Sequence, residues 1–379
     1  MKTKTQPTQP RDSRLETPRP FLKKNQDTIF PIVGKVVPFE ICSLQRACEF
    51  CSRACRLLWA LSLAFALTLM TVSPALAQRG TPNSMEFGMG ARLEPGAPLM
   101  LESLQLAAQM PLDWVAIPFR WAQDWPQAAH WNAAGAFAQA MQQAERLNLN
   151  ILISISDAPA WAQTEQGPSP ALTAALVTDL TAMYPHALAF ELFPGANTLA
   201  GWGAAPNPSA YAFLLQTVQA RLGSASPVYL VAGGLVSAAG PQDFSAADFT
   251  RGLYQAGARP AIISLQLTGL AETISAESLQ PLEAVRAVML ENHHNAGLLW
   301  VTRFSLPLSL HNAAPQRQAA WIKDVFDLWR AQLYFGAAFY TALNPSGEVS
   351  LLMANGQPHL AAALLGNVTP DVKGLPKSG

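Results

Sequence analysis

The sequence predicts one α/β domain, a closed (β/α)8 barrel, preceded by a basic leader and an N-terminal apolar signal or anchor segment. Two observations predict the barrel. Eight short apolar runs alternate with eight amphipathic stretches, and most residues within each run are apolar. Such runs are typical of parallel strands that helices cover on both faces, and eight strand–helix repeats favour closure. The chain of 379 residues is long enough, since a barrel of this kind needs about 250.

The predicted strands are short apolar runs bounded by Gly, Pro or polar residues. They span residues 86–91, 112–118, 150–156, 187–193, 228–233, 260–267, 297–303 and 335–343.

The stretches between these runs have helical periodicity. In 133–147, apolar residues recur at spacings of three and four: Ala134, Phe137, Ala138, Met141, Ala144 and Leu147. The pattern returns in 320–330, and Asn207 followed by Pro208 is a typical opening of another helix. The barrel is predicted to occupy 78–366, with a loose polar tail over 367–379.

The zero net charge of the chain hides a split between its two parts. Residues 1–56 carry eleven Lys and Arg against five Asp and Glu, and the remainder carries fourteen against twenty. The basic part, predicted to be a disordered cytoplasmic leader, ends at an apolar segment. This arrangement fits an exported protein better than a nucleic-acid-binding protein.

The apolar segment runs from Leu57 to Val72 and leads to Ala75 and Ala77, small residues that a signal peptidase accepts. Its sixteen residues are short for a membrane span, which needs about 20. We therefore interpret 57–77 as a signal peptide cleaved after Ala77, with an uncleaved membrane anchor as the alternative. Either way, the barrel is expected outside the cytoplasm, extracellular or at the cell surface.

All four cysteines precede the apolar segment, at Cys42, Cys48, Cys51 and Cys55. Their spacing resembles metal or iron–sulfur ligation; a disordered tail, or a start codon placed too far upstream, is the alternative. Downstream, the histidines are scattered and form no predicted metal site. No cofactor is expected, and nothing indicates phosphate or nucleic-acid recognition. The membrane is an expected partner only through 57–77, if this segment stays uncleaved.

Two motifs point to one enzyme family. Residues 298–306 read Leu-Leu-Trp-Val-Thr-Arg-Phe-Ser-Leu, and 191–197 read Glu-Leu-Phe-Pro-Gly-Ala-Asn. They resemble strands seven and four of the clan-A glycoside hydrolases, retaining (β/α)8-barrel enzymes of the xylosidase and cellulase type. The family patterns there are Trp-x-Thr-Glu-Phe-Gly and Glu-Ile-Trp-Asn-Glu-Pro-Asn. The resemblance implies that the nucleophile position holds Arg303 and the acid/base position Gly195.

Weaker fragments extend the resemblance over about residues 87–365. Residues 114–121 are similar to a family Trp-Val-Lys/Arg-x-x-x-x-Trp with Ala116 in place of the basic residue, and 158–161 to the Ala-Pro-x-Trp that lines the sugar cleft. At the sixth strand, Gln266 and Thr268 stand where relatives carry His and Tyr. Several polar positions of one cleft thus differ from the family pattern, while the strands that carry them can still be recognised in the sequence.

The absence of a carboxylate at both catalytic positions predicts that the chain does not hydrolyse glycosides by the family mechanism. That mechanism needs two carboxyl groups about 5 to 5.5 Å apart. Glycine can neither attack nor protonate, and a guanidinium stays protonated. Asp157 and Glu191 are the candidates for a relocated acid/base pair, and Asp124 could also reach the cleft. The structural alternative makes Glu191 a buried carboxylate held by hydrogen bonds and Asp157 a support for its loop.

Ligand-binding candidates remain at the ends of the predicted strands. Aromatic rings and polar groups of the types that hold sugars are Trp121, Trp161, Trp202, Asn197 and Gln266. Arg303 and Arg120 could bind an anionic group or form ion pairs, and Trp300 is expected to pack under the site. The sequence therefore predicts an exported, catalytically inactive carbohydrate-binding or structural barrel, with a glycan as the expected partner. The alternative is an O-glycosyl hydrolase that uses relocated carboxylates.

Overall fold

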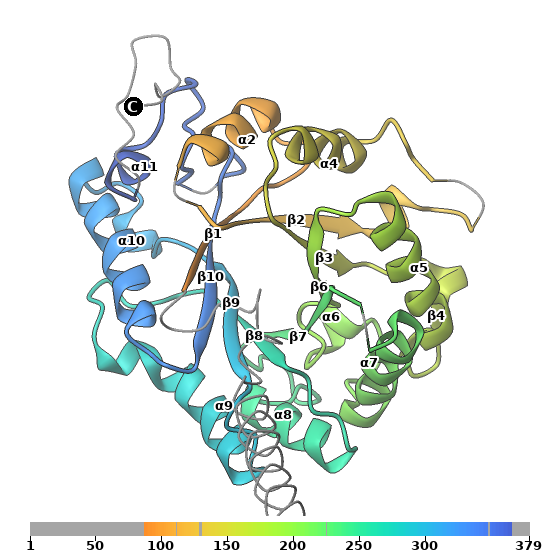
Figure 1. Ribbon diagram of the computed structural model, residues 1–379. Coiled ribbons are helices and arrows are strands. Elements are labelled where there is room, and N and C mark those ends of the chain that lie inside the picture. Colours follow the sequence, from red (N-terminus) through yellow and green to blue (C-terminus); the bar gives the residue numbers. More distant parts are fainter. Residues whose placement is uncertain (1–86, 111, 129–130, 225, 348, 366–379) are drawn as a thin grey trace, which may run out of the picture. The chain divides into compact units, whose positions relative to one another are not determined.

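The computed structural model describes residues 87–365 except 111, 129–130, 225 and 348. Within them, eight parallel strands close into a barrel in the order β1-β10-β9-β8-β7-β6-β3-β2, with helices outside (Figure 1). The predicted (β/α)8 barrel is confirmed. The leader, the 57–77 segment, the cysteines and the 367–379 tail lie outside the described residues. Among 87–365, no helix is long and apolar enough to cross a membrane.

All eight predicted strands are present, with ends that differ from the predicted ends by at most two residues. Their bounds are β1 (Gly88–Arg92), β2 (Trp114–Arg120), β3 (Ile151–Ser156), β6 (Ala187–Leu192), β7 (Tyr229–Leu235), β8 (Ile262–Leu267), β9 (Leu298–Phe304) and β10 (Phe335–Thr341). A two-stranded hairpin, β4 (Gln163–Thr164) and β5 (Gly167–Pro168), was not predicted.

The outer layer consists of α2 (Met100–Gln109), α4 (Ala136–Arg146), α5 (Pro170–Met183), α7 (Pro208–Leu222), α8 (Ala246–Gln255), α9 (Gln280–Glu291), α10 (Pro315–Arg330) and α11 (Leu360–Leu365), with short α3 (Trp121–Asp124) and α6 (Leu199–Trp202). Two predicted bounds were wrong. The helix predicted from 133 begins at Ala136, because Gly135 is its extended N-cap. The pattern at 320–330 is only the later part of α10. The predicted cap at Asn207 is confirmed, since its Oδ1 accepts the N–H groups of Ser209 and Ala210.

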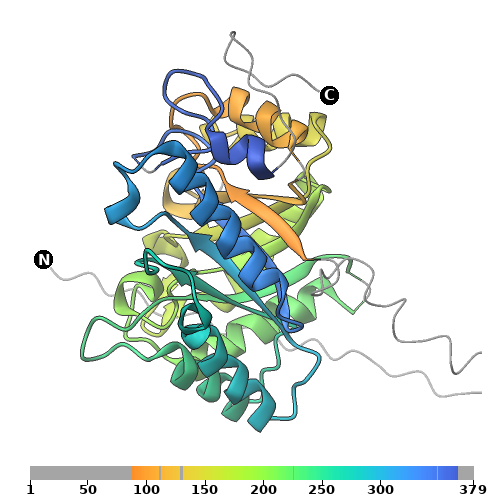
Figure 2. The ribbon, with the colours of Figure 1, turned by 90° about the vertical axis from the view of Figure 1, so that its left-hand side faces the viewer.

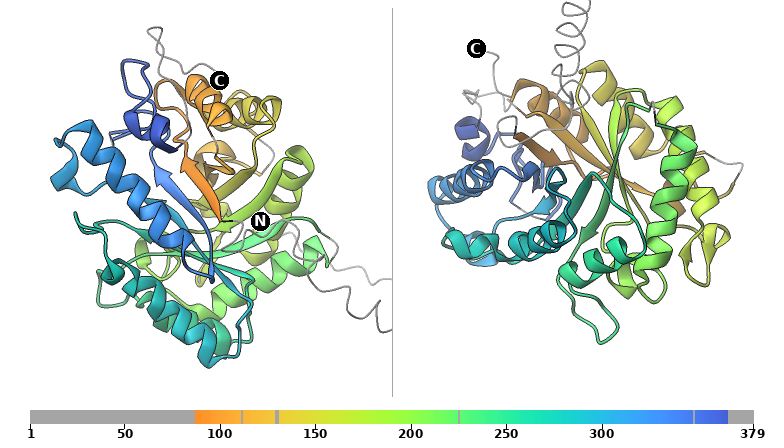
Figure 3. Two further views of the ribbon diagram at one scale, coloured as in Figure 1. Left: turned by 60° about the vertical axis from the view of Figure 1, so that its left-hand side comes forward. Right: turned by 60° about the horizontal axis from the view of Figure 1, so that its bottom comes forward.

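Two apolar layers hold the barrel together. The inner layer fills the barrel with side chains from alternate strand positions, as the pleat requires: Trp114, Ala116, Leu152, Ala189, Val231, Ile262, Trp300, Ala337 and Phe339. The outer layer packs strands against helices. Phe304 of β9, for example, meets Trp329 of α10 at 4.9 Å between ring centroids, and α10 lies along this side of the barrel (Figure 2). Elsewhere α5 and α7 pack side by side (Figure 3).

The strand β1 shows how the filled interior selects small residues. A Cβ on Gly88 would come within 2.8 Å of the Trp114 ring, and one on Gly90 within 2.5 Å of the Phe339 ring. Both glycines therefore face the interior. Two residues further along the same face is Arg92, which is 7% exposed and in register with Thr341 of β10. The sequence Gly-x-Gly-x-Arg thus carries a guanidinium to the inner edge of the barrel mouth.

Candidate functional site

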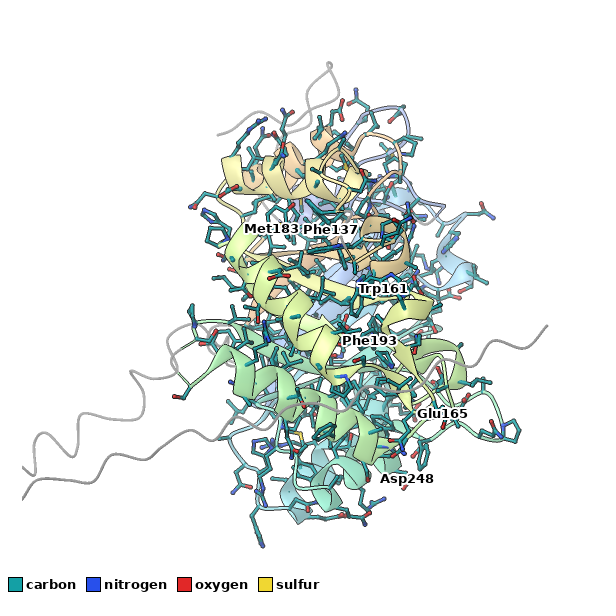
Figure 4. The ribbon with its side chains drawn as sticks, turned by 90° about the vertical axis from the view of Figure 1, so that its right-hand side faces the viewer. Phe137, Trp161, Glu165, Met183, Phe193 and Asp248 are labelled. Atoms are coloured by element: carbon teal, nitrogen blue, oxygen red, sulfur yellow. The ribbon has the colours of Figure 1, made fainter. Side chains whose placement is uncertain are left out.

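The carboxyl ends of the strands form the candidate site, as they do in barrels of this type. Trp161, in the loop after β3, lies toward this end of the molecule, and Met183, the last residue of the returning helix α5, lies toward the other (Figure 4).

Glu191 lies inside the barrel and is fully buried. Its Oε2 accepts the Ser154 hydroxyl at 2.6 Å, and its Oε1 accepts the hydroxyls of Ser264, at 2.9 Å, and Thr302. The donors belong to β3, β8 and β9, so the carboxylate joins four strands across the interior. Ser264 also accepts the N–H of Gly234 at 2.7 Å, which extends the network to β7. Both carboxylate oxygens are therefore committed to internal donors.

Asp157, the other fallback carboxylate, lies elsewhere. It is exposed, with φ +53°, and its Oδ2 accepts the Ser156 hydroxyl at 3.2 Å. Ser154 is the register partner of Glu191, so Asp157 stands three residues beyond the level of Glu191, about 10 Å along the strand axis. Asp157 also supports its loop, because its carbonyl accepts the N–H of Ala122 at 2.8 Å. The structure does not bring the two carboxylates together.

Gly195 lies in the turn after β6 with φ +82°. Its N–H points to the carbonyls of Gly233 and Gly234, at 3.0 and 2.8 Å. Asn197 is fully buried, and its amide clamps the next loop: Nδ2 donates to Val236 O and Phe244 O, and Oδ1 accepts the Val236 N–H. Asn197 was predicted to bind a ligand or to close the turn, and these hydrogen bonds support closure of the turn.

Arg303 stands at a bulge in β9. Leu265 pairs with Val301, but the next residue of β8, Gln266, pairs with Arg303, so β9 contains one extra residue at this point. Thr302 faces inward to Glu191, and Phe304 packs outward on α10. The bulge thus places Arg303 on the inner side as well. Its Nε is buried without a hydrogen-bond partner, and no ion pair holds Arg303 among the described residues.

Arg120 forms an ion pair, which was the alternative considered for it, but sequence reasoning did not identify the other members of the ion-pair network, Arg92 and Glu94. Glu94, just after β1, accepts Arg92 Nε at 3.1 Å and Arg120 Nη2 at 3.4 Å. The Asn344 side chain fixes the backbone of Glu94, through bonds to its N–H and carbonyl at 2.9 Å each. The period-two placement of Arg92 behind Gly88 and Gly90 was the available sequence signal. Its partner Glu94 could not be recognised without the tertiary structure.

Asp124, the third carboxylate considered, is buried below this network. Its Oδ2 accepts the N–H of Arg120 at 2.8 Å. Burial raises the pKa of Asp124 above its usual value, while the Arg120 N–H and the Arg120 charge oppose the rise. Asp124 therefore caps the short helix α3 from within and does not face an open cleft.

Trp161 is the exposed aromatic residue of this region. It is 38% exposed, and its Nε1 donates to Pro126 O at 2.8 Å. Trp121 is 1% exposed and supports Trp161 edge-on, with ring centroids 5.6 Å apart. A cavity of about 110 Å³ lies between the two rings, Trp125 and the side of α5. Trp161 can offer an open ring to a ligand, whereas Trp121 acts as its support.

Trp202 is 1% exposed, so no ring face is open to a ligand. Its Nε1 donates to Gln166 O at 2.7 Å, and its ring lies edge-on to Phe193 and Tyr211. The hairpin of β4 and β5 covers it, with Gly167 so close that a Cβ there would lie 2.2 Å from the indole. Trp300 is fully buried, as expected for a residue packed under the site.

Gln266 is the penultimate residue of β8 and is half-buried. It lines a cavity of about 260 Å³ between the ends of β7 and β8, together with Leu235 and Ala246. No group of three or more His, Cys, Asp or Glu side chains in the described part of the chain could hold a metal ion.

Known protein structures resemble this barrel, although no family model and no curated protein sequence matches the chain. The GH39 enzyme from Xanthomonas axonopodis pv. citri has 14% sequence identity and a TM-score of 0.56, over 76% of this chain and 67% of that one. A GH39 β-xylosidase from Caulobacter crescentus has 15% identity and a TM-score of 0.57, over 76% and 71%. A GH30 endoxylanase from Clostridium papyrosolvens C71 has 10% identity and a TM-score of 0.51, over 76% and 72%.

The fold resembles that of glycoside hydrolases. At these identities the likeness concerns the fold alone, and function has to be argued from the site.

Proposed function

We propose that the chain is an exported carbohydrate-binding barrel that does not hydrolyse glycosides by the two-carboxylate mechanism. The observation that carries the proposal is the state of Glu191. This inward carboxylate is fully buried, and hydroxyls from three strands occupy both of its oxygens. A carboxylate in this position fastens the barrel and has no access to a bound sugar.

The residues at the two implied catalytic positions support the same proposal. A retaining hydrolase needs one carboxyl group to attack the anomeric carbon and a second to protonate the leaving oxygen. Gly195 offers neither group, and its positive φ suits glycine in the turn. The guanidinium of Arg303 is a permanent cation and would repel the oxocarbenium-like transition state. We therefore propose that both catalytic glutamates have been lost.

Carbohydrate binding is supported by the surface that remains. Trp161 offers an exposed ring, on which the C–H face of a sugar can stack. Exposed Asp157 and Arg120 lie at the ends of the adjacent strands β3 and β2, and their side chains can form hydrogen bonds with sugar hydroxyl groups. The solved neighbours bear the names of a β-xylosidase and an endoxylanase, which agrees with a glycan as the ligand class.

A binding and turnover assay tests this proposal. The chain is titrated with a panel of soluble oligosaccharides and incubated with aryl glycosides. We expect saturable binding without turnover, and Trp161→Ala should weaken binding about 10- to 50-fold, because the stacking surface is lost. Phe213→Ala is the matched control, since Phe213 is an exposed aromatic on the outer helix α7. No binding to any member of the panel would leave the barrel as a scaffold and refute the proposal.

The second candidate is a hydrolase with relocated carboxylates, favoured only by the presence of Asp157 at the mouth. Turnover that persists in the pure protein and disappears in Asp157→Asn would establish it and overturn the proposed inactivity.

Export is supported by the apolar segment 57–72 and the small residues that precede Gln78. We expect the chain recovered from outside the cytoplasm to begin at Gln78, as N-terminal sequencing would show. A chain that retains residues 57–77 and stays with the membrane fraction would instead establish an anchored protein at the cell surface.

A further inference from the structure

Near the ends of three neighbouring strands, inward side chains each have a buried polar atom without a hydrogen-bond partner. These atoms are Arg303 Nε on β9, Thr341 Oγ1 on β10 and Nη1 of Arg92 on β1. β10 lies between the other two strands, and Thr341 is the register partner of Arg92. Arg92 itself is more than nine-tenths buried. The unpartnered atoms therefore lie on adjacent strands along one side of the barrel mouth. We call Arg303, Thr341 and Arg92 the cationic arc.

The chemistry of this arc calls for an acceptor. A guanidinium can only donate hydrogen bonds, and a hydroxyl can donate as well as accept. A buried donor without an acceptor is costly, so three of them on adjacent strands need an explanation, and a ligand or ordered water at this place would provide one. A ligand that presents oxygen atoms to Arg92, Thr341 and Arg303 would provide hydrogen-bond partners for the unpaired groups on all three strands.

The positive charge of the cationic arc favours an acceptor that is anionic. Arg92 and Arg120 share one carboxylate, Glu94, and Arg303 has no ion pair among the described residues. Glu94 is the ion-pair partner of Arg92 and Arg120, and the buried Asp124 carboxylate also lies near Arg120, so the three guanidinium groups still outnumber the carboxylates beside them. A further carboxylate or sulfate oxygen pair, brought by a ligand, would restore the balance, and a planar carboxylate can accept two parallel bonds from one guanidinium.

We infer that the barrel mouth binds an acidic saccharide, a uronic-acid-containing oligosaccharide, with the carboxylate held by Arg303 and Arg92. The inference rests on the proposed function. The strands that carry the groups are consecutive in the barrel: β3 with Trp161 after it, β2 with Arg120, β1, β10 and β9. Trp161 therefore follows a strand of the same rim as these groups, and the inference places one oligosaccharide across both.

Titration calorimetry on the full chain tests the inference with paired ligands. One ligand is a short oligogalacturonate, and the other is the same oligomer with its carboxyl groups reduced to neutral alcohols. We expect the acidic oligomer to bind at least about tenfold more tightly, with an affinity that falls as salt is added. Because this comparison uses the unaltered chain, it does not depend on the folding of any variant.

Variants then locate the contact. Arg303→Gln should weaken binding of the acidic oligomer about 10- to 100-fold and leave binding of the neutral oligomer unchanged. Arg303→Lys should restore only part of the affinity, since it keeps the charge and loses the planar fork. Arg146→Gln is the control, because Arg146 is exposed in the last turn of α4, at the opposite end of the barrel.

The outcomes separate this inference from the proposed function. Equal binding of the acidic and neutral oligomers would overturn the inference and leave the proposed carbohydrate binding intact. Absence of binding by both, and by the neutral panel, would overturn the proposed function itself. Binding of a sulfated oligosaccharide alone, lost in Arg303→Gln, would refute the uronate and assign the cationic arc to sulfate.

Discussion

Replacement of Glu191 by alanine is expected to lower the free energy of unfolding by about 3 to 5 kcal/mol. The substitution leaves the hydroxyls of Ser154, Ser264 and Thr302 without their acceptor in the barrel interior, and it opens a cavity where the side chain was. It also loosens Gly234, whose N–H is held by Ser264. Urea unfolding, followed by circular dichroism, measures the change if the slope of the transition stays constant.

Asp157→Asn provides the matched comparison for Glu191→Ala. Asp157 is exposed, so its replacement should change the free energy of unfolding by no more than about 0.5 kcal/mol. Ser154→Ala should lie between the two, near 1 kcal/mol, as it removes one of three donors. If Glu191→Ala proved as stable as Asp157→Asn, the carboxylate would not fasten the strands, and the main support for the proposed inactivity would be lost.

The strands could be predicted from the sequence because a parallel strand covered on both faces is apolar along its whole length. The end of β10 was predicted two residues too late, because apolarity continues there beyond the hydrogen-bonded ladder. Leu343 is fully buried, yet it follows β10, and its N–H bonds to Arg92 O at 2.7 Å in the turn. Burial continues there after regular pairing has ended.

The inner position of Arg303 illustrates what a motif adds to periodicity. Simple alternation from Trp300 and Thr302, both inward, would place Arg303 on the outer face. The bulge in β9 reverses the alternation, and no residue within 298–304 predicts a bulge there. The resemblance to a catalytic strand nevertheless placed Arg303 at the barrel mouth, because a motif match depends on the position along the strand and not on which face a side chain is assigned to.

The cationic arc could not have been found from the sequence, because it consists of relations between distant strands. Arg92 and Thr341 are separated by almost the whole barrel in the chain and become neighbours only when β1 closes on β10. An unpartnered atom is likewise a property of the packed structure. Sequence reasoning identified Arg303 as a possible anion-binding residue. The case for an anionic ligand, however, depends on the neighbouring side chains of Thr341 and Arg92.

The tryptophans show the same limit. Trp121, Trp161 and Trp202 all follow strand ends and read alike, but only Trp161 keeps an open face. The difference depends on what covers each ring: the hairpin of β4 and β5 covers Trp202, and Trp161 itself covers Trp121. The positive φ of Gly167, +115°, lets the hairpin backbone approach Trp202.

Trp202→Ala is accordingly expected to lower the free energy of unfolding by about 3 to 5 kcal/mol, the range for removal of a large buried aromatic. The loss should reach the mouth, because the neighbouring Tyr211 donates its hydroxyl to Leu192 O at 2.6 Å and accepts the Gly233 N–H at 2.7 Å. Burial also raises the pKa of Tyr211, so this hydroxyl stays neutral and keeps its proton to donate.

Trp161→Ala separates the structural role of Trp202 from a binding role. Trp161 is partly exposed and loses one hydrogen bond, to Pro126 O, so its replacement should cost about 1 kcal/mol of stability while it weakens binding. Trp202→Ala should show the opposite order: a large loss in urea unfolding, and ligand affinity lost only as the fold is lost. Should Trp202→Ala instead unfold at the urea concentration of the unaltered chain and bind oligosaccharide more weakly, its ring would contact the ligand, and the hairpin that covers it would have to open.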